Sequence, residues 1–141
     1  MKLNTGKSVA IPIEFTDRGV TENIYFNPAD PDLIVRFDEM QHRVSEKLEG
    51  LKDFELGADG APKDKALIDL FQSTKQIICQ EVDRAFSGNV SEVVFKYCNP
   101  LAIVDGKYFI LQFLEAAMPE IEKHIKKAQA KMEKHLAKYQ K

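Results

Sequence analysis

The side chains of this chain that could do chemistry are three histidines and two cysteines. His42, His124 and His135 lie far apart in the sequence and form no spacing, such as HxxxH or CxxC, that typically holds a metal ion. Cys79 and Cys98 lie on apolar helical patterns and are predicted to be free thiols that pack in the core. We therefore expect no metal, no cofactor and no catalytic nucleophile.

A short segment near the N-terminus matches only part of a phosphate-binding motif. Gly6-Lys7-Ser8 matches the end of a phosphate loop, but that loop needs another glycine five residues before Gly6, and position 1 is Met1. The carboxylates are spread over predicted exposed helix faces, and no pair is set in an apolar pocket, as a general acid would require. The sequence therefore predicts a protein that is not an enzyme.

The charge of the chain is divided unevenly. From Glu122 to Lys141 there are seven lysines and two glutamates, a local balance of +5, which leaves −7 for residues 1–121 out of a total of −2. A basic end on an acidic body can bind nucleic acid or an acidic partner, or can pack on the protein's own acidic surface.

The length of 141 residues is typical of one domain, which we expect to span residues 1–141. No apolar run approaches the ~18 residues of a membrane span, and the start lacks the apolar stretch of a secretory signal. We expect a cytoplasmic protein without a membrane partner.

The first part of the chain, residues 8–27, is predicted to be a β-hairpin. Val9 to Phe15 alternate apolar and polar residues, 16–19 have turn composition, and apolar residues at even spacing follow at Val20, Ile24 and Phe26. Pro12 cannot donate a hydrogen bond, so its strand is predicted to pair on one side only.

Residues 30–118 are predicted to form the helical core. Asp30-Pro31-Asp32 is typical of a helix start, and a loop is expected at 57–62. Steps of three or four residues give the first helix an apolar stripe of Leu33, Phe37, Met40, Val44, Leu48 and Leu51. The second helix, from Lys63 to Phe86, has Leu67, Leu70, Phe71, Ile78, Val82 and Phe86, with Ile77 and Cys79 widening the stripe.

The segment Asp83 to Phe95 is predicted to be a helix junction. Gly88 is expected to end the second helix in the left-handed conformation. Asn89 and Glu92 are expected to form a capping box for a short helix that ends at Asn99-Pro100.

The last helix is predicted to begin near Phe109 and to reach the end of the chain. Residues 101–109 contain Asp-Gly between apolar runs, which indicates a hairpin, but a loop before the helix is preferred. Helical steps continue through Phe109, Phe113, Ala117, Ile121, Ile125, Ala128, Met132, Leu136 and Tyr139. Pro119 is predicted to kink this helix rather than end it, and residues 119–141 form a basic C-terminal helix. The predicted fold is mainly α, a small helical bundle with an N-terminal β-hairpin and a long, kinked C-terminal helix.

These features, in this order, resemble the tail assembly chaperones of long-tailed bacteriophages and related prophages. The likeness is closest from Leu67 to Ile121, through the segments FSGNVSEVVF and CNPLAIVDGKYFILQFLEAAMPEI. The positions that match the family's junction and its Phe-Leu-rich helix are Phe86, Gly88, Ser91, Phe95, Phe113 and Leu114.

The resemblance implies a non-enzymatic protein of the bacterial host cytoplasm that binds the tape measure protein, helps to recruit tail tube protein and is absent from the mature virion. Coating a long helical client requires apolar helix faces in several copies, so self-association is expected. The candidate partner-binding residues are Phe109, Phe113, Leu114, Ile121, Ile125 and Met132, and core packing is the alternative role for each.

A second interpretation is a nucleic-acid-binding or regulatory helical protein whose lysine-rich C-terminal helix contacts phosphates. Arginine is rare and only Tyr139 interleaves the lysines, so nucleic acid is the less favoured partner.

Overall fold

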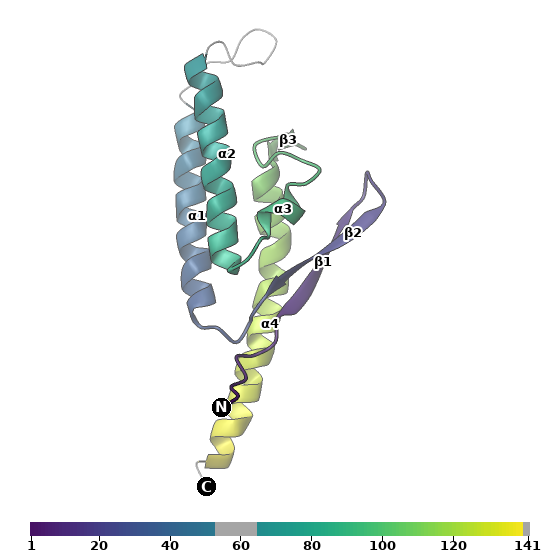
Figure 1. The fold of residues 1–141 in the computed structure, drawn as a ribbon, viewed down its shortest axis with the longest axis vertical. Coiled ribbons are helices and arrows are strands. Elements are labelled where there is room, and N and C mark those ends of the chain that lie inside the picture. The colour runs from purple at the N-terminus through teal and green to yellow at the C-terminus, as the bar shows by residue number, and fades with distance from the viewer. Residues whose placement is uncertain (53–64, 140–141) are drawn as a thin grey trace.

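The structure, a computed structural model, describes residues 1–52 and 65–139. The fold is mainly α, with an N-terminal hairpin and a long C-terminal helix, as the sequence predicts (Figure 1). Its elements are β1 (Val9–Phe15), β2 (Val20–Phe26), α1 (Asp32–Leu51), α2 (Lys65–Phe86), α3 (Ser91–Val94), β3 (Ile103–Val104), β4 (Lys107–Tyr108) and α4 (Phe109–Tyr139). The predicted loop at 57–62 lies outside the described residues.

The N-terminal hairpin has the predicted strands, β1 and β2, which pair antiparallel from Val9 with Phe26 to Phe15 with Val20. Ile11 and Phe15 of β1 are buried, whereas the residues between them on the other face are exposed. The backbone carbonyl of Phe15 accepts hydrogen bonds from the backbone N–H groups of Arg18 and Gly19, and these bonds close the turn between β1 and β2. Among the described residues, β1 pairs with β2 alone, as predicted from Pro12.

Helix α1 buries the predicted stripe in full, since its buried residues are Leu33, Phe37, Met40, Val44, Leu48 and Leu51. Asp30 supports the helix start, because its Oδ1 accepts the backbone N–H of Asp32 at 3.0 Å. α2 packs beside α1, and two ion pairs join their exposed edges, Arg43 to Glu81 at 3.2 Å and Arg84 to Glu39 at 2.9 Å.

The end of α2 differs from its prediction at one residue. Ser87, not Gly88, takes the left-handed conformation, with φ of 56°. The N–H of Ser87 donates to the carbonyl of Arg84, and the N–H of Gly88 donates to that of Asp83. This is the Schellman pattern with serine at the left-handed position, where the sequence rule favours glycine.

The predicted capping box at Asn89 and Glu92 is wrong. α3 begins at Ser91 without a side-chain cap from the residue before it. Its cap comes from α2, because the carboxylate of Asp83 accepts the backbone N–H of Ser91 at 2.7 Å and the Ser91 hydroxyl at 2.8 Å. A carboxylate anchored on a long helix therefore holds the short helix in place.

The loop preferred for residues 101–109 is also wrong, because this segment contains a small hairpin. Ile103 pairs with Tyr108 and Val104 with Lys107. Asp105 and Gly106 both have positive φ, 53° and 83°, as a tight two-residue turn between strands requires. α4 starts directly after β4, so the helix itself begins where it was predicted.

Helix α4 runs from Phe109 through Pro119 to Tyr139 without ending at the proline, as predicted. The predicted kink at Pro119 stays a prediction. The first half of α4 packs in one core with the hairpin, α1, α2 and α3, whereas its last part extends beyond the other helices (Figure 1). No helix within the described residues is long and apolar enough to cross a bilayer.

Candidate functional site

The residues considered for chemistry are separated in the structure. His42 Nδ1 donates a hydrogen bond to the Asp38 carbonyl, His124 packs on the ring of Phe26, and His135 is exposed. Across residues 1–52 and 65–139, no group of three His, Cys, Asp or Glu side chains is placed to hold a metal ion.

Both cysteines are free and half-buried rather than fully buried. Burial raises the pKa of the Cys79 thiol, and Asp83 adds to the rise. Burial also raises the pKa of the Cys98 thiol, with a further contribution from Asp17. Each thiol is therefore held in its protonated, weakly nucleophilic form at neutral pH.

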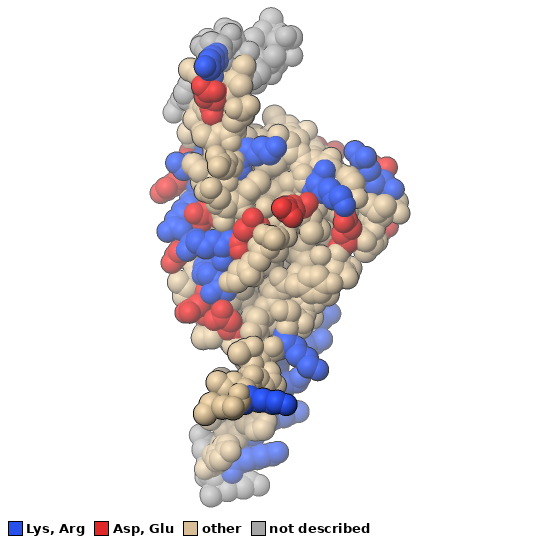
Figure 2. All heavy atoms as spheres, viewed as in Figure 1, with Lys and Arg blue, Asp and Glu red and all other residues tan. Residues whose placement is uncertain are grey.

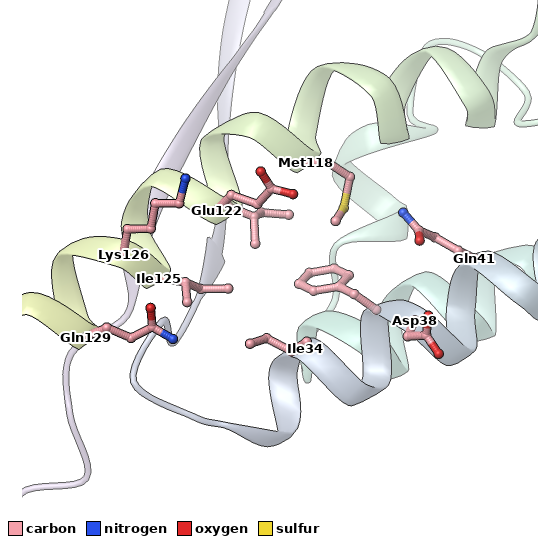
Figure 3. Close-up of a pocket in the computed structure, with 10 residues that line it drawn as sticks. Ile34, Asp38, Gln41, Met118, Glu122, Ile125, Lys126 and Gln129 are labelled. Atoms are coloured by element: carbon pink, nitrogen blue, oxygen red, sulfur yellow. The ribbon is translucent and has the colours of Figure 1, made fainter.

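A groove of about 340 Å³ lies between α1 and α4, and we call it the α1–α4 groove. Ile34 of α1 and Met118 and Ile125 of α4 point into it (Figure 3). Its remaining lining residues are Phe37, Asp38, Gln41, Ile121, Glu122, Lys126 and Gln129. The apolar floor and polar edge fit the apolar side of an amphipathic helix.

The apolar stripe of α4 continues out of this groove onto the projecting part of the helix. Its residues become progressively less covered: Ile121 is 1% exposed, Ile125 is half-buried, Met132 is 55% exposed and Tyr139 is 86% exposed. Leu136, one turn after Met132, is 50% exposed. We call Ile125, Met132, Leu136 and Tyr139 the α4 seam. At about 100° per residue these four lie within about 60° of one another around the helix.

The six residues predicted to bind a partner divide between core and surface. Phe113, Leu114 and Ile121 are buried in the core, and Phe109 and Ile125 are half-buried against it. Met132 is the one of the six whose side chain is more than half exposed. Of these residues, Ile125 and Met132 therefore contribute to the seam.

A second, larger groove of about 760 Å³ lies against the N-terminal hairpin, and we call it the hairpin groove. It is formed by β1, the segment after α3, the β3–β4 turn and the first part of α4. Its apolar lining includes Ile11, Ile13, Val94, Phe109, Phe113 and Ala117. At about 100° per residue, Phe109 lies on the side of the helix away from the seam, Phe113 lies on its flank and Ala117 lies beside the seam.

Among the residues that the structure describes, Glu14, Asp17, Asp105 and Glu120 are the charged residues that line the hairpin groove, and no lysine or arginine lines it. Arg18 and Lys96 lie nearby over the ring of Tyr97, at 5.0 and 5.4 Å from its centroid. Lys96 is paired with Glu22, which explains why a glutamate occupies an inward position of β2.

The lysines are concentrated on the projecting part of α4 (Figure 2). They are Lys123, Lys126, Lys127, Lys131, Lys134 and Lys138, against Glu133. Among the described residues none of these lysines forms an ion pair. The basic helix therefore does not pack on the protein's own acidic surface.

The projecting part of α4 is uncovered, since residues 129–139 are exposed on every side.

Comparisons with protein-family models, with curated protein sequences and with solved structures each find no match to this chain. The grooves and the seam are therefore interpreted from their own geometry.

Two features of the grooves are not predicted by the sequence patterns. Ile34 lies outside the buried stripe of α1, and its apolar side chain at an exposed position is the signal that could have indicated a surface groove. The four carboxylates of the hairpin groove come from three separate parts of the chain, and only the packing of the hairpin against α4 brings them to one site.

Proposed function

We propose that this chain is a non-enzymatic helix-binding chaperone. Its client would lay the apolar side of an amphipathic helix in the α1–α4 groove and along the α4 seam. The observation that carries the proposal is the stripe on α4 that is buried at Ile121 and uncovered from Ile125 to Tyr139.

The geometry supports a helical rather than a compact client. From Met118 to Tyr139 the groove and seam extend about 32 Å along α4, at 1.5 Å per residue. Such a surface is long and narrow, so it matches one helix of about six turns. Lysines flank the seam, which favours a client with acidic residues beside its apolar stripe.

The resemblance of residues 67–121 supplies the more specific proposal. The client would be the tape measure protein of a long-tailed phage or prophage, kept soluble in the host cytoplasm while tail tube protein is recruited. The chaperone would then leave, and it would be absent from the mature virion. Tape measure proteins of this kind are long and helix-rich, which fits the proposed surface.

Co-expression tests this function. The chain is produced together with the tape measure protein encoded nearest to it, and the soluble fraction is analysed by size-exclusion chromatography with light scattering. We expect the long protein to be soluble only in the presence of this chain and to elute with several copies of it. A client that stays insoluble, with this chain eluting alone, would refute the proposal.

A second candidate function rests on the unpaired lysines of the projecting helix, which are free to contact phosphates. If the chain binds nucleic acid, the logarithm of its association constant for duplex DNA falls steeply and linearly with the logarithm of the salt concentration. Fluorescence anisotropy across a salt series measures this directly, and a flat response at low salt would exclude it.

A further inference from the structure

The hairpin groove is lined by four acidic residues, and the nearby cations Arg18 and Lys96 lie over the ring of Tyr97. Within the described part of the chain, none of Glu14, Asp17, Asp105 and Glu120 forms an ion pair. These carboxylates line an apolar groove whose volume of about 760 Å³ is ample for several large side chains. An acidic, apolar groove is suited to a basic segment that presents an apolar stripe.

The chain itself contains such a segment, the projecting part of α4. Its seam exposes Met132, Leu136 and Tyr139, and Lys131 and Lys138 flank these residues on one side of the helix. Its unpaired lysines complement the unpaired carboxylates of the groove.

The projecting part of α4 cannot reach the hairpin groove of its own chain. α4 is a continuous helix whose first half forms one wall of that groove, at Phe109, Phe113 and Glu120. Met132 lies 12 residues, or about 18 Å, beyond Glu120 along the same helix. The groove and the seam that suit each other must therefore belong to different copies.

We propose that the projecting part of α4 of one copy docks, seam inward, in the hairpin groove of a second copy. Lys131 and Lys138 then lie near the carboxylates of Asp17 and Glu120. The occupant of the groove is thus a second copy of this chain, selected by charge and by the exposed apolar stripe.

This contact joins two different surfaces, so it leaves each copy with one free helix and one free groove. Copies therefore add head to tail, into open chains or closed rings, as concentration rises. Because exposed lysines and carboxylates contribute, the association weakens as salt screens them, over a Debye length of about 8 Å at physiological ionic strength.

Docking also covers the seam that the proposed function gives to the client, so client and second copy compete for it. This competition rests on the proposed function, whereas the docking does not. A variant that cannot accept a second copy would still bind client, which separates the two proposals experimentally.

Two complementary variants test the docking. Lys131→Glu with Lys138→Glu reverses the charge of the helix, and Asp17→Lys with Glu120→Lys reverses the charge of the groove; all four positions are without an ion pair among the residues described. The matched control, Lys47→Glu with Lys75→Glu, makes the same charge change on the exposed faces of α1 and α2. Circular dichroism verifies that each variant is folded.

Sedimentation velocity over a concentration series measures the association. We expect each reversed variant to associate at least tenfold more weakly than the natural chain, the control to stay within about threefold, and an equimolar mixture of the two reversed variants to regain association. A natural chain that is monomeric throughout, reversed variants that associate like the control, or a mixture that stays monomeric would each overturn the proposal.

Discussion

Asp83→Ala should destabilise the protein by about 2 kcal/mol, because this carboxylate holds the start of α3. It accepts the backbone N–H of Ser91 at 2.7 Å and the Ser91 hydroxyl at 2.8 Å. Hydrogen bonds to a charged group contribute about 1.5–3 kcal/mol each, whereas losing a helix cap costs about 0.5–2 kcal/mol. Ser91 is only 8% exposed, so water replaces these bonds incompletely, and a value near 2 kcal/mol follows.

Urea unfolding followed by circular dichroism measures this loss. With a denaturant slope of roughly 2 kcal/mol per molar, the midpoint should fall by about 1 M without a change in slope. Ser91→Ala removes only the hydroxyl bond and should cost about 1 kcal/mol. Because the two residues share a bond, the double variant should cost less than the sum of the single variants.

The matched control is Asp69→Ala, which removes an exposed carboxylate of the same helix and should change stability by less than about 0.5 kcal/mol. If Asp83→Ala is no more destabilising than Asp69→Ala, Asp83 does not cap α3 and the account of this junction is wrong.

Three further predictions follow from the backbone and the thiols. Ser87→Gly should stabilise the protein by about 0.5–1 kcal/mol in the same urea assay, since Ser87 has φ of 56°, and Gly88→Ala should not reproduce the gain. Gly106→Ala should cost about 1 kcal/mol or more, because φ of 83° in the β3–β4 turn is strained for alanine; an unchanged urea midpoint would contradict the turn geometry. Cys79 should react with iodoacetamide more slowly than free cysteine, because burial raises the pKa of its thiol. A rate of reaction equal to that of free cysteine would contradict this prediction. Because the Cys79 thiol loses its proton at lower pH in the unfolded chain than in the folded chain, its contribution to the free energy of unfolding is complete below the ordinary thiol pKa and is lost as pH rises through the raised pKa.

The periodic parts of the fold were predictable because burial follows helical and strand spacing directly. The stripe from Leu33 to Leu51 is buried as predicted, and Pro12 lies on a strand that pairs on one side. The same reasoning extends to α4, where helical steps from Phe109 onward outweigh the proline at position 119.

The errors came from features that local patterns do not encode. The cap of α3 comes from Asp83, eight residues before Ser91, whereas the capping rule examines only the nearest residues and selects Asn89. The hydrogen bonds of the last turn end the helix at Phe86, so the left-handed position falls on Ser87, one residue before the glycine. The small hairpin at Asp105 was underestimated because two-residue strands show almost no alternation.

The candidate sites were predictable only in part. Spacing alone indicates that the α4 seam is apolar, but it cannot tell that Ile121 is covered while Met132 is not. Whether a residue of α4 is buried depends on how far α1 and the N-terminal hairpin extend along this helix, and that depends on the tertiary packing.

The most direct test of the central claim is the affinity of the client for the α4 seam. Met132 and Leu136 are 55% and 50% exposed, so covering each should contribute about half of the 1.5–3 kcal/mol of a fully buried side chain. Together the two residues should contribute about 1.5–3 kcal/mol, so Met132→Asp with Leu136→Asp should weaken client binding by at least about tenfold. The matched control is Ala130→Asp with Ala137→Asp, which adds the same charges on the opposite side of the helix.

The measurement is a titration of labelled, soluble helical segments of the tape measure protein with the natural chain and both variants. The account predicts tight binding by the natural chain, a loss of at least about tenfold with the seam variant and a change below about threefold with the control. Equal affinity of the seam and control variants, or no binding by the natural chain, would contradict it.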